Sequence, residues 1–174
     1  MSLPLPDTHA HPGDAAASLR QQPRTEAQAL AAACDVQAQA LLQAGAFDEA
    51  LLAFRRAAAI TPHALARLQN LGLLAAYLGH PDIALPPLTS AVARWGANRP
   101  VDPQCVMMLA FLRFDQGDRK GLLRCQHVLQ DMAIRQPDCP GVRRMGRMAE
   151  VLLVQHLGDQ ADTATLLQAL GAGL

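Results

Sequence analysis

Apolar residues recur at a helical spacing along most of the chain. From Thr25 to Leu42, alanine, leucine and glutamine residues follow the 3.6-residue period until Gly45 ends the pattern. A second apolar series follows almost at once and runs to Pro62, with Asp48 in its first turn, where negative charge complements the helix dipole. The two segments predict a short helical hairpin.

The same pattern then returns around two further glycines. Gly79 follows Gly45 by 34 positions, and it again lies between two helix-like segments. Gly117 follows Gly79 by 38 positions, and the additional residues fall in the Pro-containing linker 96–103, so we expect helices over about 103–116 and 118–135. The remaining stretch, 142–171, is expected to form a degenerate fourth hairpin or a pair of capping helices.

A period of 34 residues and the pattern of small residues resemble the tetratricopeptide-repeat family. Small residues are needed where two helix backbones approach closely. The positions that match are the turn 45–50 with Phe54, Ala57 and Pro62, then Leu68, Leu71, Gly72, Gly79, Ala84 and Ala91. The chain departs from the family pattern at Pro81, Arg113 and Arg119, where large apolar or aromatic residues are usual.

The resemblance implies an all-α fold, a solenoid of helical hairpins with about three repeats and C-terminal capping helices. The repeats would cover 31–64, 65–98 and 103–136, with capping helices over 142–171, inside a repeat domain spanning 25–174. Residues 1–24 hold several prolines among small and polar residues, a composition that buries too little apolar area to offset the entropy of ordering. We therefore expect a flexible N-terminal tail.

Composition removes several function classes. The formal net charge is zero, so the positive field that attracts nucleic acid or anionic lipid is missing from the molecule as a whole, and no run is long and apolar enough to span a membrane. The four cysteines form no C-x-x-C pair, which favours reduced structural thiols in a cytoplasmic protein. No catalytic or phosphate-binding motif is present, so we expect neither an enzyme nor a metal or cofactor site.

In a solenoid of hairpins the first helices line the concave side, where an extended peptide can bind. Met107, Phe111 and Phe114 share one helical face, and methionine with aromatics forms an adaptable apolar surface. The alternative is that the C-terminal helices or the N-terminal tail cover this stripe as ordinary core. The predicted groove residues are Gln39, Leu42, Gln69, Leu73, Tyr77, Met107, Phe111 and Phe114.

The overall plan is similar to that of the class II chaperones of bacterial type III secretion. That resemblance implies a cytoplasmic chaperone whose groove holds an extended segment of a hydrophobic translocator, with another protein as its partner. Tetratricopeptide domains that clamp a terminal carboxylate are disfavoured, because Asp35 and Ala66 stand where that clamp has asparagine or a cation. The alternatives are a scaffold or adaptor subunit of a larger bacterial assembly, and homodimerisation through the N-terminal helix.

Overall fold

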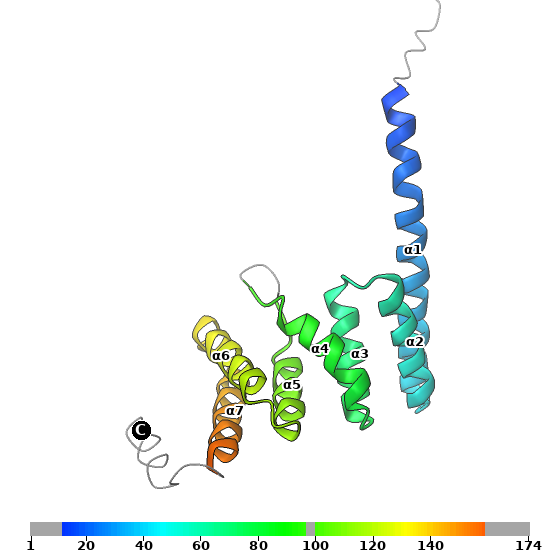
Figure 1. The fold of residues 1–174 in the computed structure, drawn as a ribbon. Helices are drawn as coiled ribbons and strands as arrows, with labels where there is room; N and C mark the ends of the chain where they lie inside the picture. Colours follow the sequence, from blue (N-terminus) through cyan, green and yellow to red (C-terminus); the bar gives the residue numbers. More distant parts are fainter. Residues whose placement is uncertain (1–11, 97–99, 159–174) are drawn as a thin grey trace, which may run out of the picture. The chain divides into compact units, whose positions relative to one another are not determined.

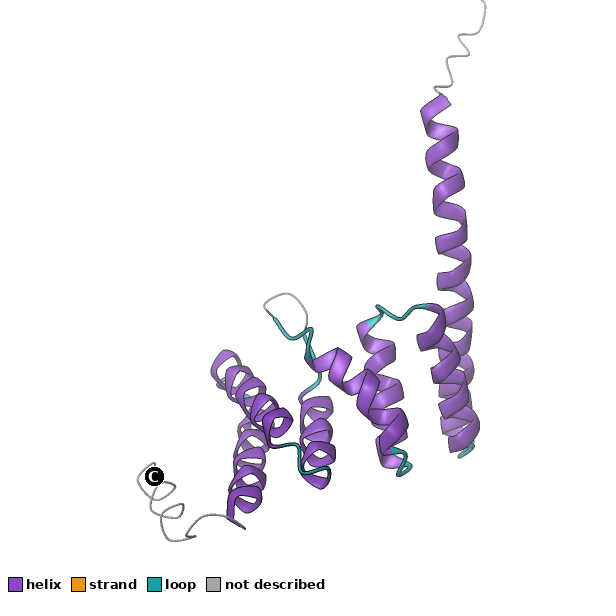
Figure 2. Ribbon diagram, viewed as in Figure 1, coloured by secondary structure: helices purple, strands orange, loops and turns teal. Residues whose placement is uncertain are grey.

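The computed structural model describes residues 12–96 and 100–158, and within those ranges it contains seven α-helices and no strand (Figures 1 and 2). The all-α prediction is confirmed for these residues. The helices are α1 (Pro12–Gln43), α2 (Phe47–Ile60), α3 (Leu65–Tyr77), α4 (Pro81–Val92), α5 (Pro103–Asp115), α6 (Arg119–Arg135) and α7 (Pro140–Gly158).

The chain divides into two compact units, residues 1–62 and 63–174. In the first unit, α1 and α2 run side by side in opposite directions (Figure 1). In the second unit, α3 pairs with α4 and α5 pairs with α6. Helix α5 also packs against α3 and α4, and α7 packs against α5 and α6 in the same way.

Three hairpin turns have the same geometry. Gly45, Gly79 and Gly117 take φ values of 76°, 77° and 68°, in the left-handed region that favours glycine. In each turn the N–H of the following residue donates to the carbonyl five positions earlier, from Ala46 to Leu41, from His80 to Ala75 and from Asp118 to Arg113, at 2.9 Å each. This bond, with the glycine N–H bonded three residues back, makes a Schellman motif that ends one helix and starts the next. The three glycines therefore occupy equivalent bends.

Small residues fill the places where paired helices meet. Ala50 and Ala57 of α2 are fully buried, as are Ala84 and Ala91 at the corresponding positions of α4. Gly72 of α3 lies so close to α4 that an added Cβ would stand 2.5 Å from the Leu88 Cγ. The small residues singled out in the sequence therefore do permit close helix approach.

The third hairpin reaches the same arrangement with larger side chains. Leu122 and Leu129 of α6 are fully buried at the positions where α2 and α4 have alanines. Ala110 of α5 takes the place of Gly72, and it is fully buried as well. Alanine on the first helix and leucine on the second thus form the contact of the third hairpin.

The first helix begins earlier than the sequence predicted. Helix α1 starts at Pro12, so it includes residues 12–24, which the sequence analysis placed in a flexible tail that ended before Thr25. The run 15–22 consists mostly of strong helix formers, and proline at position 12 is compatible with the first turn of a helix, which explains the extension. The rest of the expected tail, residues 1–11, lies outside the described residues.

Proline does not end the fourth helix. Pro86 and Pro87 stand inside α4, where each lacks the N–H that would bond one turn back. The buried Pro87 side chain lies beside Leu88, which is fully buried against Gly72. Tertiary packing of this face therefore maintains a helix that local propensity would interrupt.

Replacing Gly72 with alanine tests the close contact between α3 and α4. Alanine raises helix propensity by about 1 kcal/mol, but its Cβ forces the buried Leu88 to move, and such overpacking costs about 1–3 kcal/mol. We expect Gly72→Ala to lower the free energy of unfolding measured by urea denaturation.

The matched control is Gly146→Ala. Gly146 also lies inside a helix, but an added Cβ meets nothing within 4 Å. This variant should be neutral or slightly more stable, so equal effects of the two substitutions would contradict the close approach at Gly72.

Candidate peptide-binding surface

The predicted groove residues occupy equivalent positions on the first helix of each hairpin. Gln39, Leu73 and Phe111 each stand six positions before the hairpin glycine, and Leu42 and Phe114 each stand three before it. Gln39 is exposed and Leu42 is half-buried on α1, in the first unit. The other six residues all belong to the second unit, on α3 and α5.

Helix α3 presents a partly open face. Gln69, Leu73 and Tyr77 follow one another at four-residue intervals, so they lie along one side of the helix. Gln69 and Leu73 are half-buried, whereas Tyr77 is 68% exposed. An exposed aromatic side chain whose hydroxyl stays in water suits a contact that is apolar on one side and wet on the other.

Helix α5 continues this face with aromatic residues. Phe111 and Phe114 are half-buried, and the Phe114 ring packs edge to face against His156 of α7, with ring centroids 6.0 Å apart. Met107 is only 6% exposed, so it belongs to the core and offers little surface to a ligand. The accessible part of the α5 stripe therefore centres on Phe111, with one side of Phe114 covered by α7.

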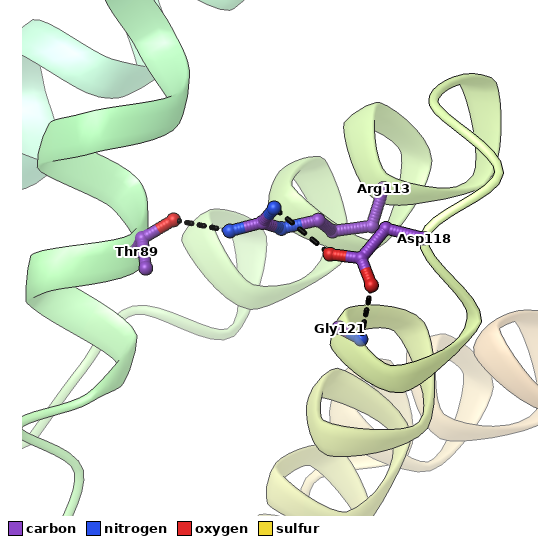
Figure 3. Close-up of polar contacts among 4 residues, drawn as sticks. All are labelled: Thr89, Arg113, Asp118 and Gly121. Atoms are coloured by element: carbon purple, nitrogen blue, oxygen red, sulfur yellow. Dashed lines mark hydrogen bonds and ion pairs between the residues drawn. The ribbon is translucent and has the colours of Figure 1, made fainter.

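Arg113 explains one departure from the repeat pattern. Its guanidinium forms an ion pair with Asp118, with Nη1 2.9 Å from Oδ2, and Nη2 donates to the Thr89 hydroxyl at 3.0 Å (Figure 3). The other Asp118 oxygen accepts from the Gly121 N–H at 2.9 Å, which caps the start of α6. One arginine thus joins α4, α5 and the start of α6.

Gly121 makes room for this network. A Cβ at Gly121 would stand 2.5 Å from the Asp118 Oδ2 and 2.8 Å from the Arg113 Cδ. The sequence analysis did not identify this group, although an aspartate directly after the turn glycine, Asp118 after Gly117, is a typical N-cap signal.

A second polar cluster joins Trp95, in the connection between α4 and α5, to helix α6. Trp95 donates from Nε1 to the Asp131 Oδ2 at 2.7 Å, and the Arg135 guanidinium lies over the indole ring, 5.6 Å from its centroid. Arg135 also pairs with Asp131 at 3.0 Å. The hydrogen bond from Trp95, and then that from Arg135, lower the pKa of Asp131 below its ordinary value. The sequence analysis missed this cluster, whose one local signal was the i, i+4 pair of Asp131 and Arg135.

The cysteines are all free thiols. Burial raises the pKa of Cys105 to about 12, and nearby Asp102 adds to the effect. Burial also raises the pKa of Cys125 to about 12, against the opposing charges of Arg113 and Arg124. Both thiols therefore stay protonated, and they fill the core as small apolar groups.

A cleft of about 410 Å³ lies between α6 and α7, lined by Gln130, Ala133, Pro140, Arg143, Gly146, Arg147 and Glu150. Within 12–96 and 100–158, no three His, Cys, Asp or Glu side chains gather closely enough to hold a metal ion. None of the helices in these ranges combines the length and apolarity that crossing a membrane requires.

Comparison with known proteins assigns the chain to no family. No protein-family model matches the sequence, and no curated protein matches it either.

Lowering the pH should break the hydrogen bond between Trp95 and Asp131. Because the pKa of Asp131 is lowered in the folded chain, this contact stabilises the fold above the ordinary aspartate pKa of about 3.9 and is lost as the pH falls through the folded value. Trp95 is the single tryptophan, so its fluorescence reports on this site alone. We expect constant emission from pH 8 to about pH 5, and a change in acid.

The control is Asp131→Asn, which can still accept a hydrogen bond but does not titrate. Its emission should lose the acid-dependent step, while far-UV circular dichroism follows any global unfolding. An identical fluorescence titration in both proteins would show that Asp131 does not govern the environment of Trp95.

Alkylation should separate the four cysteines into two pairs. Cys34 and Cys139 are half-buried, whereas Cys105 and Cys125 are fully buried with raised pKa values. Raising a thiol pKa from 9.0 to about 12 cuts the reactive thiolate by roughly a thousandfold at neutral pH. Iodoacetamide followed by mass spectrometry should modify Cys34 and Cys139 first, and all four only in denaturant. Early modification of Cys105 or Cys125 would contradict the packing described for α5 and α6.

Proposed function

We propose that this chain is a tetratricopeptide-type protein-binding module that holds an extended segment of another polypeptide along its first helices. The observation that supports this proposal is the partly exposed apolar face formed by Leu73 and Tyr77 on α3 and by Phe111 on α5. Helices α3 and α5 pack against each other within one unit, so side chains at equivalent positions can contact one continuous ligand.

The repeated turns support the stacked arrangement that such a groove needs. The turns at Gly79 and Gly117 have the same geometry, and α5 packs on α3 and α4, which favours a stack of hairpins within the second unit. Gln39 and Leu42 of α1 occupy the equivalent positions of the first hairpin. The ligand is an extended peptide with apolar side chains at intervals, because the face on α3 and α5 combines apolar residues with Gln69.

The most specific version of this proposal is a cytoplasmic chaperone that keeps a hydrophobic secreted client soluble, like the translocator chaperones of type III secretion. The half-buried aromatic face fits that task, since it would cover apolar segments that otherwise aggregate. The binding of a protein segment, rather than catalysis, agrees with an apolar surface beside which the ion pair between Arg113 and Asp118 joins α5 to the start of α6.

The second candidate is a scaffold subunit that binds its partner through other surfaces. Ile134 on α6 is 78% exposed, and Leu123 of the same helix is also exposed. Large apolar side chains on a second helix favour a protein contact away from the first-helix face.

Affinity purification from the native host, followed by mass spectrometry, identifies the partner, and overlapping fluorescent peptides of that partner locate the bound segment. Phe111→Ser should weaken peptide binding about tenfold or more, because truncation of a central aromatic anchor commonly removes over 1.4 kcal/mol. Fluorescence anisotropy measures the Kd, and circular dichroism checks that helicity is kept. Met107 is unsuitable for this test, since its side chain is buried.

The matched control is Ile134→Ser, which removes an exposed apolar side chain from α6. Unchanged binding in this variant, together with weaker binding in Phe111→Ser, supports the first-helix face. The reverse pattern would support the scaffold and overturn the proposed groove.

A further inference from the structure

The cleft between α6 and α7 is a feature of the second unit that the proposed groove does not use. Its lining includes two arginines of α7, Arg143 and Arg147, and the Gln130 amide of α6. Its volume of about 410 Å³ lies within the range of about 300–1,000 Å³ that is typical of ligand-binding sites. The cleft therefore has room for several side chains of a ligand.

The two arginines carry charges that no described carboxylate neutralises. Arg143 and Arg147 are exposed, and neither forms an ion pair with any residue in 12–96 or 100–158. Half-buried Glu150 also lines the cleft, but two guanidinium groups against one carboxylate leave a net positive charge. On α6, Asp131 is already paired with Arg135. The cleft is thus an electropositive site.

The arginines stand near the end of a helix that normally carries acidic residues. Helix α7 begins at Pro140, has no acidic residue in its first turn, and carries Arg143, Arg144 and Arg147 close to that end. The positive end of the helix dipole repels these cations, and a bound anion would offset the repulsion. Such conflicts between local preference and sequence are expected at functional sites.

Apolar side chains continue the same side of α7. Val151 stands one turn after Arg147, and it is 49% exposed. Met148, next to Arg147 in the chain, is 48% exposed. Apolar surface beside the two arginines suits a peptide better than a bare anion such as phosphate, which has no apolar part.

The spacing along α7 matches that of an extended peptide. Arg143, Arg147 and Val151 follow one another at four-residue intervals, about 6 Å along the helix axis. Alternate residues of an extended chain point to the same side and are about 6.6–6.8 Å apart. A peptide with two acidic residues and one apolar residue at alternate positions can therefore meet these three side chains in succession.

We propose that the cleft between α6 and α7 binds an acidic, extended segment of a partner protein. Two alternate carboxylates of the segment pair with Arg143 and Arg147, and the next alternate side chain, an apolar one, packs on Val151. Pairs of guanidinium and carboxylate are charge-assisted hydrogen bonds, which provide both affinity and register. The site is separate from the proposed groove, because no residue of α3 or α5 lines it.

Fluorescence anisotropy with labelled peptides and the full chain tests this proposal. The probe is Ser-Glu-Ser-Glu-Ser-Leu, and the control peptide has glutamine in place of both glutamates. We expect the acidic peptide to bind, and its affinity to fall as sodium chloride is added, because salt screens exposed ion pairs. The glutamine peptide should bind about tenfold more weakly or worse. Absence of binding by the acidic peptide, or equal binding of the two peptides, would overturn the proposal.

A third peptide tests the extended arrangement. Ser-Ser-Glu-Glu-Ser-Leu has the same composition and charge as the probe, but its glutamates are adjacent and point to opposite sides of an extended chain. It should bind more weakly than the probe. Equal affinity would show that only net charge is recognised, which contradicts the proposed pairing with Arg143 and Arg147.

Variants of the protein provide the independent check. Arg143→Gln combined with Arg147→Gln should weaken the acidic peptide about tenfold or more, without lowering stability to urea, because cations are unfavourable at this end of a helix. The matched control, Arg119→Gln with Lys120→Gln, removes the same charge from exposed positions at the start of α6 and should keep the affinity. Glu150→Gln should tighten binding, since it removes a like charge. Equal losses in the two double variants would reduce the effect to long-range attraction and overturn the site.

Two further measurements separate this site from other ligands and surfaces. Phe111→Ser, which tests the proposed groove, should leave the affinity for the acidic peptide unchanged whether or not that groove exists. A loss of binding in this variant would place the acidic peptide on α5 instead. Release of the peptide by inorganic phosphate, at an ionic strength at which sodium chloride leaves it bound, would identify a phosphate site and overturn the proposal.

Discussion

The left-handed glycine at the end of each first helix is the constraint on which the rest of the structure depends. A residue with a Cβ is strained at φ values near +70°, so glycine allows the chain to reverse within one turn while the helix carbonyls stay hydrogen bonded. The reversal brings the second helix against the first at a fixed position. The side chains at this contact must therefore be complementary in size: a small residue on one helix faces a larger one on the other, as Gly72 of α3 faces Leu88 of α4.

The sequence predicted the hairpins well because their signals are local. Helical periodicity, the turn glycines Gly45 and Gly79, and the small alanines of the second helices can each be recognised within a single hairpin. The start of α1 was set too late because residues 1–24 were judged by their overall composition, although Pro12 suits a first turn and residues 15–22 favour helix. Helix propensity alone would also interrupt α4 at Pro86 and Pro87, because propensity does not include the packing of the buried Pro87 side chain.

The polar clusters were not predictable in the same way, because their partners are distant in sequence. Trp95 and Asp131 are 36 positions apart, and Arg113 reaches Thr89 across 24 positions. Only the fold brings them together. The same reasoning explains Met107, which shares a helical face with Phe111 in the sequence but is buried by neighbouring elements. Periodicity identifies a face, and tertiary packing decides how much of that face remains open to a ligand.

The proposed groove depends on α3 and α5 presenting one continuous face, and a crystal structure of the chain with its bound peptide segment tests this most directly. The account predicts that the peptide contacts Leu73 and Tyr77 of α3 and Phe111 of α5 in one extended run. A peptide seated on α6, or one that leaves Phe111 in solvent, would contradict it.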